Sequence, residues 1–232
     1  MKMKKNIQKE NNPVEKKDHA PLVISYLIIR SAIGVLGIIF PVILVLGSLV
    51  TGGEDEILPS ISNYYHSNMR DLFVGILCAV SLFLFSYKGY ERIDNVAGNL
   101  GCIFALGVVF LPTSTGDTLI TRDPLIGKLH LMFAALFFLV LIFYSLFLFT
   151  KTDKKVIKGQ KQNRNRIYRV CGYTMLGCIL LIALYFLFLQ ESFPGLAKLD
   201  PVFWLESISL WAFGISWLTK GEILWKDVKN KP

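Results

Sequence analysis

Apolar runs of about twenty residues recur six times along the chain and restrict the folds open to it. A helix of that length crosses the roughly 30 Å hydrocarbon core of a membrane. Because the runs are continuously apolar, without the alternation that lipid-facing strands need, a transmembrane β-barrel does not fit them. We therefore predict an all-α polytopic membrane protein whose six transmembrane helices form one bundle. The predicted spans cover residues about 25–50, 71–88, 94–112, 129–150, 169–190 and 202–219.

The composition agrees with a membrane location. Charged residues make up 18% of the 232-residue chain and hydrophobic residues 53%, whereas soluble domains carry about 25% charged residues. We predict three parts: a basic cytoplasmic leader over 1–20, a membrane domain over 21–219 and a cytoplasmic tail over 220–232. The leader is expected to be disordered, because its Lys, Asn and Glu residues bury little apolar surface.

The positions of the basic residues predict the topology. Twenty of the 25 Lys and Arg residues precede span one, follow span six, or lie between spans two and three or four and five. Four lie in the intervening loops, and Arg30 lies inside the first apolar run. This positive-inside distribution predicts that both termini are cytoplasmic, in the plasma membrane of a prokaryote, and the leader composition points to a bacterial source. Because topology explains the net charge of +8, we expect no nucleic-acid partner.

Polar residues that could carry a function gather at the predicted outer ends of the spans. The stretch 60-SISNYYHSNMRD-71 places His66, Arg70 and Asp71 at the start of span two. His130 lies in the first turn of span four, and Glu206 lies about 6 Å into span six at 1.5 Å per residue. A carboxylate inside hydrocarbon needs a partner, so these residues are predicted to share one layer at the outer leaflet. Two tyrosines of the stretch are predicted interfacial aromatics, Tyr64 and Tyr65.

Three interpretations of this outer layer remain open. In the first, Arg70, Asp71 and Glu206 satisfy one another and cap helix ends. In the second, Arg70 and His130 bind a lipid phosphate, and the tyrosines add stacking or hydrogen bonds. In the third, the layer is a zinc hydrolase site with ligands drawn from His66, His130, Asp71 and Glu206. The sequence contains no HExxH and no GxSxG motif, so the catalytic residues of such an enzyme stay unassigned.

Three further residues have an expected place at the membrane surface. Arg30 is predicted to extend to the inner interface along its aliphatic stem. Trp204 and Trp217 suit interfacial anchors at the two ends of span six.

The order of several short motifs resembles a known family. These motifs are "LPSIS" at Leu58–Ser62, "DLFVGIL" in span two, "NLGCIFALGVVFLP" in span three, "KLHLMFAALFFLVLIFYSLFLF" in span four and "FWLESISLWAFGISWLTKGE" in span six. Over about residues 22–225 the chain resembles the Frag1/DRAM/Sfk1 family of six-span membrane proteins and related uncharacterised bacterial membrane proteins. Asn63 stands where the family usually has Asp, so no functional residue is transferred from that loop. The resemblance implies a role connected with membrane lipids.

The leading hypothesis is a non-enzymatic, lipid-interacting or regulatory membrane protein with a polar site at the outer leaflet. The alternatives are an intramembrane metal-dependent hydrolase acting on a lipid and a small-molecule transporter. The expected partners are membrane lipids, and no cofactor is expected unless the zinc alternative holds. The sequence leaves the oligomeric state and the choice between enzyme and non-enzyme open.

Overall fold

A computed structural model describes residues 14–53, 56–87, 89, 91–114, 124–151 and 159–224, with side chains from Tyr26 onward. Within this part the regular structure is helical, with no strand, so the all-α prediction is confirmed. The elements are α1 (Val14–Val50), η1 (Ile61–His66), α2 (Arg70–Ser86), α3 (Arg92–Phe110), α4 (Pro124–Phe143), η3 (Tyr144–Leu148), α5 (Gly159–Leu184), η4 (Tyr185–Leu189), α6 (Gln190–Ser192), η5 (Pro194–Leu199) and α7 (Pro201–Lys220).

Five helical segments of the described chain are long and apolar enough to cross a membrane. They are Tyr26–Val50, Arg92–Phe110, Pro124–Leu148, Gly159–Ser192 and Pro201–Lys220. The chain is therefore a membrane-embedded helical protein. The segment predicted as span two forms α2, which has 17 residues and is the shortest of the long helices. The sixth crossing and the orientation of the termini stay predictions.

Three helices begin five or more residues before their predicted spans. Helix α1 starts at Val14, inside the leader predicted as disordered, and residues 1–13 lie outside the described part. Helix α4 starts at Pro124 and α5 at Gly159, five and ten residues before the predicted spans. Hydropathy marks where a helix enters hydrocarbon, but a nucleated helix continues into polar sequence because each added residue gains a backbone hydrogen bond.

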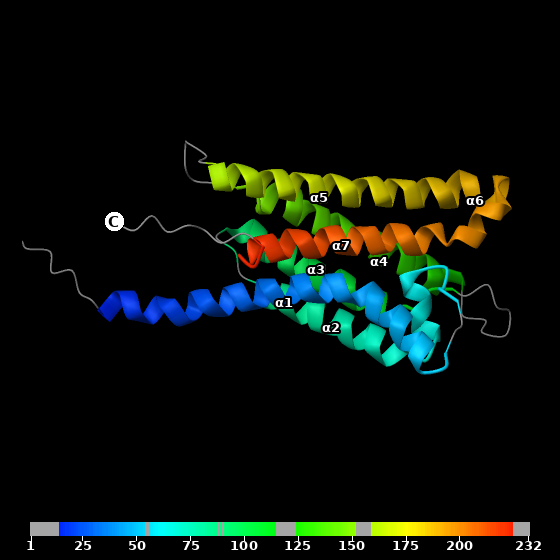
Figure 1. The fold of residues 1–232 in the computed structure, drawn as a ribbon, viewed down its shortest axis with the longest axis horizontal. Coiled ribbons are helices and arrows are strands. Elements are labelled where there is room, and N and C mark those ends of the chain that lie inside the picture. Colours follow the sequence, from blue (N-terminus) through cyan, green and yellow to red (C-terminus); the bar gives the residue numbers. More distant parts are fainter. Residues whose placement is uncertain are drawn as a thin grey trace, which may run out of the picture.

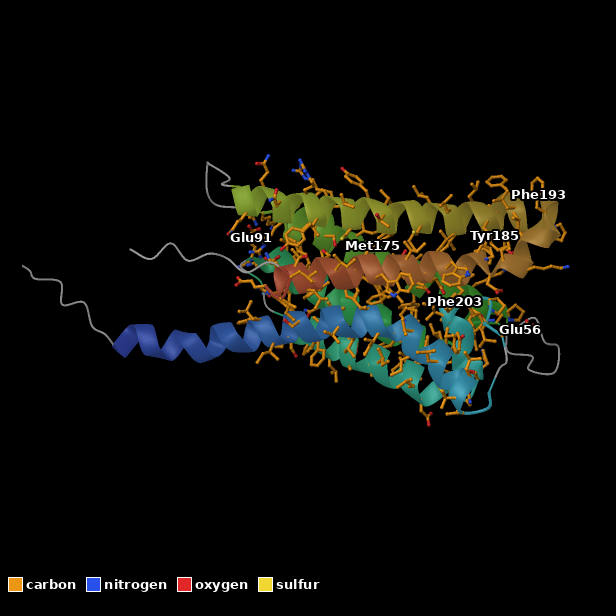
Figure 2. The ribbon with its side chains drawn as sticks, in the orientation of Figure 1. Glu56, Glu91, Met175, Tyr185, Phe193 and Phe203 are labelled. Atoms are coloured by element: carbon orange, nitrogen blue, oxygen red, sulfur yellow. The ribbon has the colours of Figure 1, made fainter. Side chains whose placement is uncertain are left out.

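Helix α7 lies in the middle of the bundle, between α1 on one side and α5 on the other (Figure 1). Helices α2, α3 and α4 pack in sequence order beside them. We call the bundle end that holds the C-terminus of α7 and the N-termini of α3 and α5 the basic end. The opposite end, called the loop end, holds η1 and α6. Figure 2 shows Glu91 at the basic end and Glu56, Phe193 and Phe203 at the loop end.

The α1–α7 contact brings two backbones together at glycines. A Cβ atom on Gly214 would lie 2.7 Å from the carbonyl oxygen of Gly34, and one on Gly34 would lie 2.9 Å from the carbonyl oxygen of Gly214. Small residues allow such close approach between helices in lipid, where packing replaces the hydrophobic effect as the driving force. Four residues further along α1, the Trp211 indole donates to the Ile38 carbonyl at 3.2 Å.

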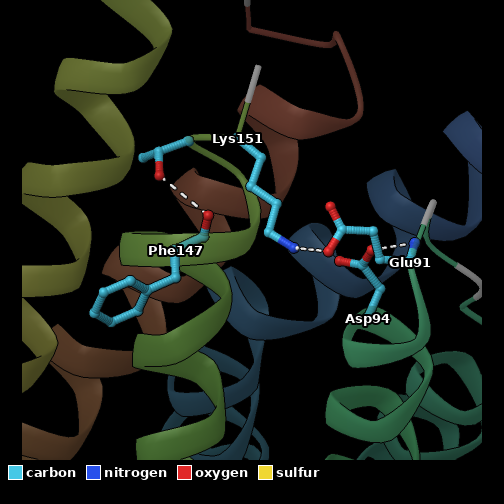
Figure 3. Close-up of polar contacts among 5 residues, drawn as sticks. Glu91, Asp94, Phe147 and Lys151 are labelled. Atoms are coloured by element: carbon cyan, nitrogen blue, oxygen red, sulfur yellow. Dashed lines mark hydrogen bonds and ion pairs between the residues drawn. The ribbon is translucent and has the colours of Figure 1, made fainter. Parts of the chain in front are cut away.

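The basic end carries an ion pair between two loops. Lys151, after η3, lies 2.8 Å from the Glu91 carboxylate, and the Glu91 N–H donates to Asp94 in a capping box that starts α3 (Figure 3). The hydrogen bond to Glu91 raises the pKa of Lys151. Both side chains of the pair are solvent-exposed, so water screens the attraction and the pair mainly sets the position of the loop.

Replacing Gly214 with Ala should destabilise the protein by about 1–3 kcal/mol, because the added methyl group meets a backbone carbonyl that has no rotamer to change. Gly177→Ala in α5 is the matched control, since nothing lies within 4 Å of its added Cβ atom. Thermal unfolding in detergent measures both variants. Equal Tm values for the two would contradict the close α1–α7 packing.

Candidate functional site

Glu206 of α7 forms a hydrogen bond to the start of η1. Its Oε2 atom accepts a hydrogen bond from the Ile61 N–H at 2.7 Å, at the start of η1. In the same place the Phe203 N–H of α7 donates to the Pro59 carbonyl at 3.0 Å. The intramembrane carboxylate thus satisfies an orphan donor of η1, and the loop in turn satisfies a donor at the first turn of α7.

Both candidate histidines contact the segment that leaves α3. His66 Nε2 lies 2.8 Å from the Thr113 carbonyl, and His130 Nδ1 lies 2.5 Å from the Leu111 carbonyl. Because a carbonyl only accepts, His130 carries a hydrogen on Nδ1, which leaves Nε2 of the neutral ring as an acceptor. The His130 side chain is 1% exposed, and its buried Nε2 has no hydrogen-bond partner within the described chain.

Of the other candidates, Tyr65 packs edge-on against His66, with ring centroids 5.2 Å apart. Arg70 donates to the Tyr65 hydroxyl at 2.9 Å and stacks over the same ring, with Cζ 4.6 Å from the centroid. Asp71 is exposed in the first turn of α2. Tyr64 packs against Phe203 and is fully buried, and Tyr65 is 8% exposed. Both rings are folded into the bundle by η1, and the interfacial position of the two tyrosines stays a prediction.

A cavity of about 740 Å³ opens at the loop end between α4, α5 and α7. Apolar side chains form much of its wall, including Leu131, Ala134, Phe138, Ile179, Ile182 and Phe186. Polar side chains also line it, including Ser60, Ser62, Asn63, Lys128, His130 and Glu206. The wall thus has an apolar part, made of side chains of α4, α5 and η4, and a polar part, made of side chains that include Ser60, His130 and Glu206.

The structure brings together only part of the predicted layer. His130 and Glu206 both line the cavity, together with the first residues of the stretch, whereas Arg70 and Asp71 do not. Asp200 and Gln190, which are not among the residues predicted from the sequence, also line it. Asp200 precedes the Pro201 that begins α7, and that Asp-Pro helix start is a pattern from which it could have been found.

Among the charged side chains of the cavity wall, carboxylates outnumber cations. Its wall includes two carboxylates, Asp200 and Glu206, and one Lys, Lys128. Burial raises the pKa of Asp200, and the nearby negative charge of Glu56 raises it further. With the His130 Nε2 acceptor added, this region favours a group that donates hydrogen bonds.

The zinc alternative gains no support from these positions. Across residues 14–224, leaving out the undescribed gaps, no three His, Cys, Asp or Glu side chains come together as a metal-sized cluster. Comparison with protein-family models, curated proteins and solved structures found no match to the chain.

Replacing Glu206 with Ala should destabilise the protein by about 1–3 kcal/mol, because the Ile61 N–H loses its acceptor. Glu206→Gln is the control, since its amide oxygen can still accept from Ile61. Thermal unfolding and hydrogen exchange at Ile61 measure the effect. Unchanged exchange at Ile61 in Glu206→Ala would show that the contact does not hold the loop.

Proposed function

We propose that the chain is a non-enzymatic plasma-membrane protein that binds an amphipathic, lipid-like molecule in the loop-end cavity. The carrying observation is that this cavity is lined both by apolar side chains of α4 and α5 and by polar side chains that include His130 and Glu206. Its volume of about 740 Å³ falls in the range of roughly 300–1,000 Å³ typical of small-molecule sites.

Entry from the lipid phase suits the cavity wall. Leu131 of α4 and Phe186 of η4 both line the cavity, and these residues are 48% and 42% exposed. In a membrane these exposed faces contact lipid tails, so a chain can pass between α4 and α5 without crossing water. The resemblance to a lipid-linked family supports the same function.

The polar groups favour a ligand head that donates hydrogen bonds, such as a hydroxyl or an amine. The Glu206 carboxylate already accepts from the Ile61 N–H, whereas the buried His130 Nε2 has no hydrogen-bond partner among the described residues. An unpaired acceptor in a buried site is costly until a donor reaches it. Arg70, the cation expected to bind a phosphate, is engaged with Tyr65 and does not line the cavity. A diacylglycerol or a monoacylglycerol is therefore a better probe than an anionic phospholipid.

Filling the apolar part of the cavity should abolish binding of a monoacylglycerol. Ala183→Phe places a ring in the cavity wall, whereas Gly177→Phe adds a ring to the same helix at a position with open space around it and outside the cavity lining. We expect the parent and Gly177→Phe to retain monoacylglycerol adducts in native mass spectrometry and Ala183→Phe to lose them. Adducts of equal abundance in all three proteins would argue against this site.

We also propose that α2 makes the sixth crossing, with both termini cytoplasmic. The 17 residues of α2 lie at the lower limit of about 17–25 for a membrane-spanning helix. With α2 counted, the helices alternate in direction and the basic end faces the cytoplasm, as the positive-inside distribution requires.

Cysteine labelling tests this topology. In a chain whose four native cysteines are replaced by Ser, a cysteine at Asn68 should react with a membrane-impermeant maleimide in intact cells. A cysteine at Lys151 should react only after the membrane is opened, because it lies at the basic end. Both positions are exposed in the structure. Labelling of both, or of Lys151 alone, in intact cells would overturn the proposed orientation.

A further inference from the structure

Neither carboxylate of the loop-end cavity is paired with a cation of the described chain. Glu206 and Asp200 are both half-buried and line the cavity, together with Lys128, which is exposed. In the part of the chain that the structure describes, neither Glu206 nor Asp200 forms an ion pair with a Lys or Arg. A carboxylate that is removed from water without a counterion is costly, so this wall favours a positively charged ligand.

The loop end as a whole holds more carboxylates than cations within the described residues. Its carboxylates are Glu56, Asp71, Glu191, Asp200 and Glu206, and its cations are Arg70, Lys128 and Lys198. Arg70 is engaged with Tyr65, and Lys128 and Lys198 are exposed. Burial and the negative charge of Glu56 both raise the pKa of Asp200. A cationic ligand supplies the positive charge that the described chain does not bring to the cavity.

Glu206 and His130 are acceptors among the residues that line the cavity. Glu206 Oε2 accepts from the Ile61 N–H at 2.7 Å, but a carboxylate has about four acceptor sites, so capacity remains for a ligand. His130 is 1% exposed, and its buried Nε2 has no hydrogen-bond partner among the described residues. Because contacts to the Ile61 N–H and the Leu111 carbonyl hold these two side chains, a donor meets acceptors that are already oriented.

The two carboxylates lie at different depths along α7. Glu206 comes six residues after Asp200, which is about 9 Å along a helix at 1.5 Å per residue. One ammonium group therefore contacts only one of them. Glu206 lies within the apolar helix, whereas Asp200 precedes it, so Glu206 is the direct partner and Asp200 attracts a cation from a distance.

We propose that the ligand of this cavity is an amphiphile with a primary amine head, whose ammonium group donates to Glu206 and to His130 Nε2. This inference rests on the proposed lipid-binding function and names the class of its ligand. A primary ammonium group supplies three N–H donors and a positive charge, whereas a hydroxyl supplies one donor and no charge. Hydrogen bonds in which a partner is ionised are about twice as strong as neutral ones.

Competition between two amphiphiles of equal chain length tests the charge of the head. Dodecylamine, which is protonated at about pH 7, and dodecanol are each titrated against the monoacylglycerol adduct of the full-length protein in an uncharged detergent. Native mass spectrometry follows the loss of that adduct. We expect dodecylamine to displace the monoacylglycerol at a concentration about tenfold or more below that of dodecanol, because only the amine pairs with Glu206.

Variants then separate the cavity from general surface charge. Glu206→Gln should weaken dodecylamine about tenfold and leave dodecanol within about twofold of the parent, since Gln keeps the acceptor for Ile61 and loses the charge. Asp200→Asn should weaken dodecylamine by a smaller factor, and Asn tolerates the left-handed backbone of residue 200, with φ 47°. Glu191→Gln is the matched control, because it removes the same charge from an exposed residue of α6 that does not line the cavity.

The outcomes separate this inference from the function on which it rests. If monoacylglycerol and dodecanol bind and dodecylamine displaces no better than dodecanol, the amine head is overturned and the lipid-binding function stands. If none of the three compounds binds, the lipid-binding function fails and the amine head fails with it. Equal weakening of dodecylamine by Glu206→Gln and Glu191→Gln also overturns the amine head, since it indicates a diffuse attraction. Should Glu206→Gln not fold, Asp200→Asn is compared with Glu191→Gln in the same way.

Discussion

The backbone contact between α1 and α7 is the constraint on which the remaining structure depends. Gly34 and Gly214 let the two helices approach until a Cβ atom on either would meet a carbonyl oxygen of the other. This contact places α7 in the centre of the bundle, with α5 on its other side. A hydrogen bond between the Ser145 and Ser216 hydroxyls, at 2.8 Å, also joins α7 to η3.

Because α7 is central, both ends of the bundle are built on it, and they have opposite chemistry. At the loop end Glu206 accepts from Ile61 and lines a cavity rich in acceptors. At the basic end Lys220 and Trp217 belong to a region rich in cations and aromatic rings.

Some residues could be recognised from the sequence as candidates, but their partners could not. Glu206 was recognisable as a carboxylate in apolar sequence, but its partner, the Ile61 N–H, lies 145 residues away and is a backbone group with no residue-type pattern. His130 was recognisable as a polar residue at a helix start, but its carbonyl partner at Leu111 fixes which nitrogen remains an acceptor. Arg70 and Asp71 follow His66 in the stretch 60–71, but neither residue lines the cavity.

The sequence by itself determined the class of this protein, because the length and continuity of its apolar runs require helices in a membrane. It also determined the uneven distribution of charge between the two ends of the bundle. Only the tertiary structure decided which polar residues meet, where the cavity lies and that Trp217 is buried. The physical reason is that hydropathy is a local property, whereas a partner across the bundle depends on helix rotation and on close contacts such as Gly34–Gly214.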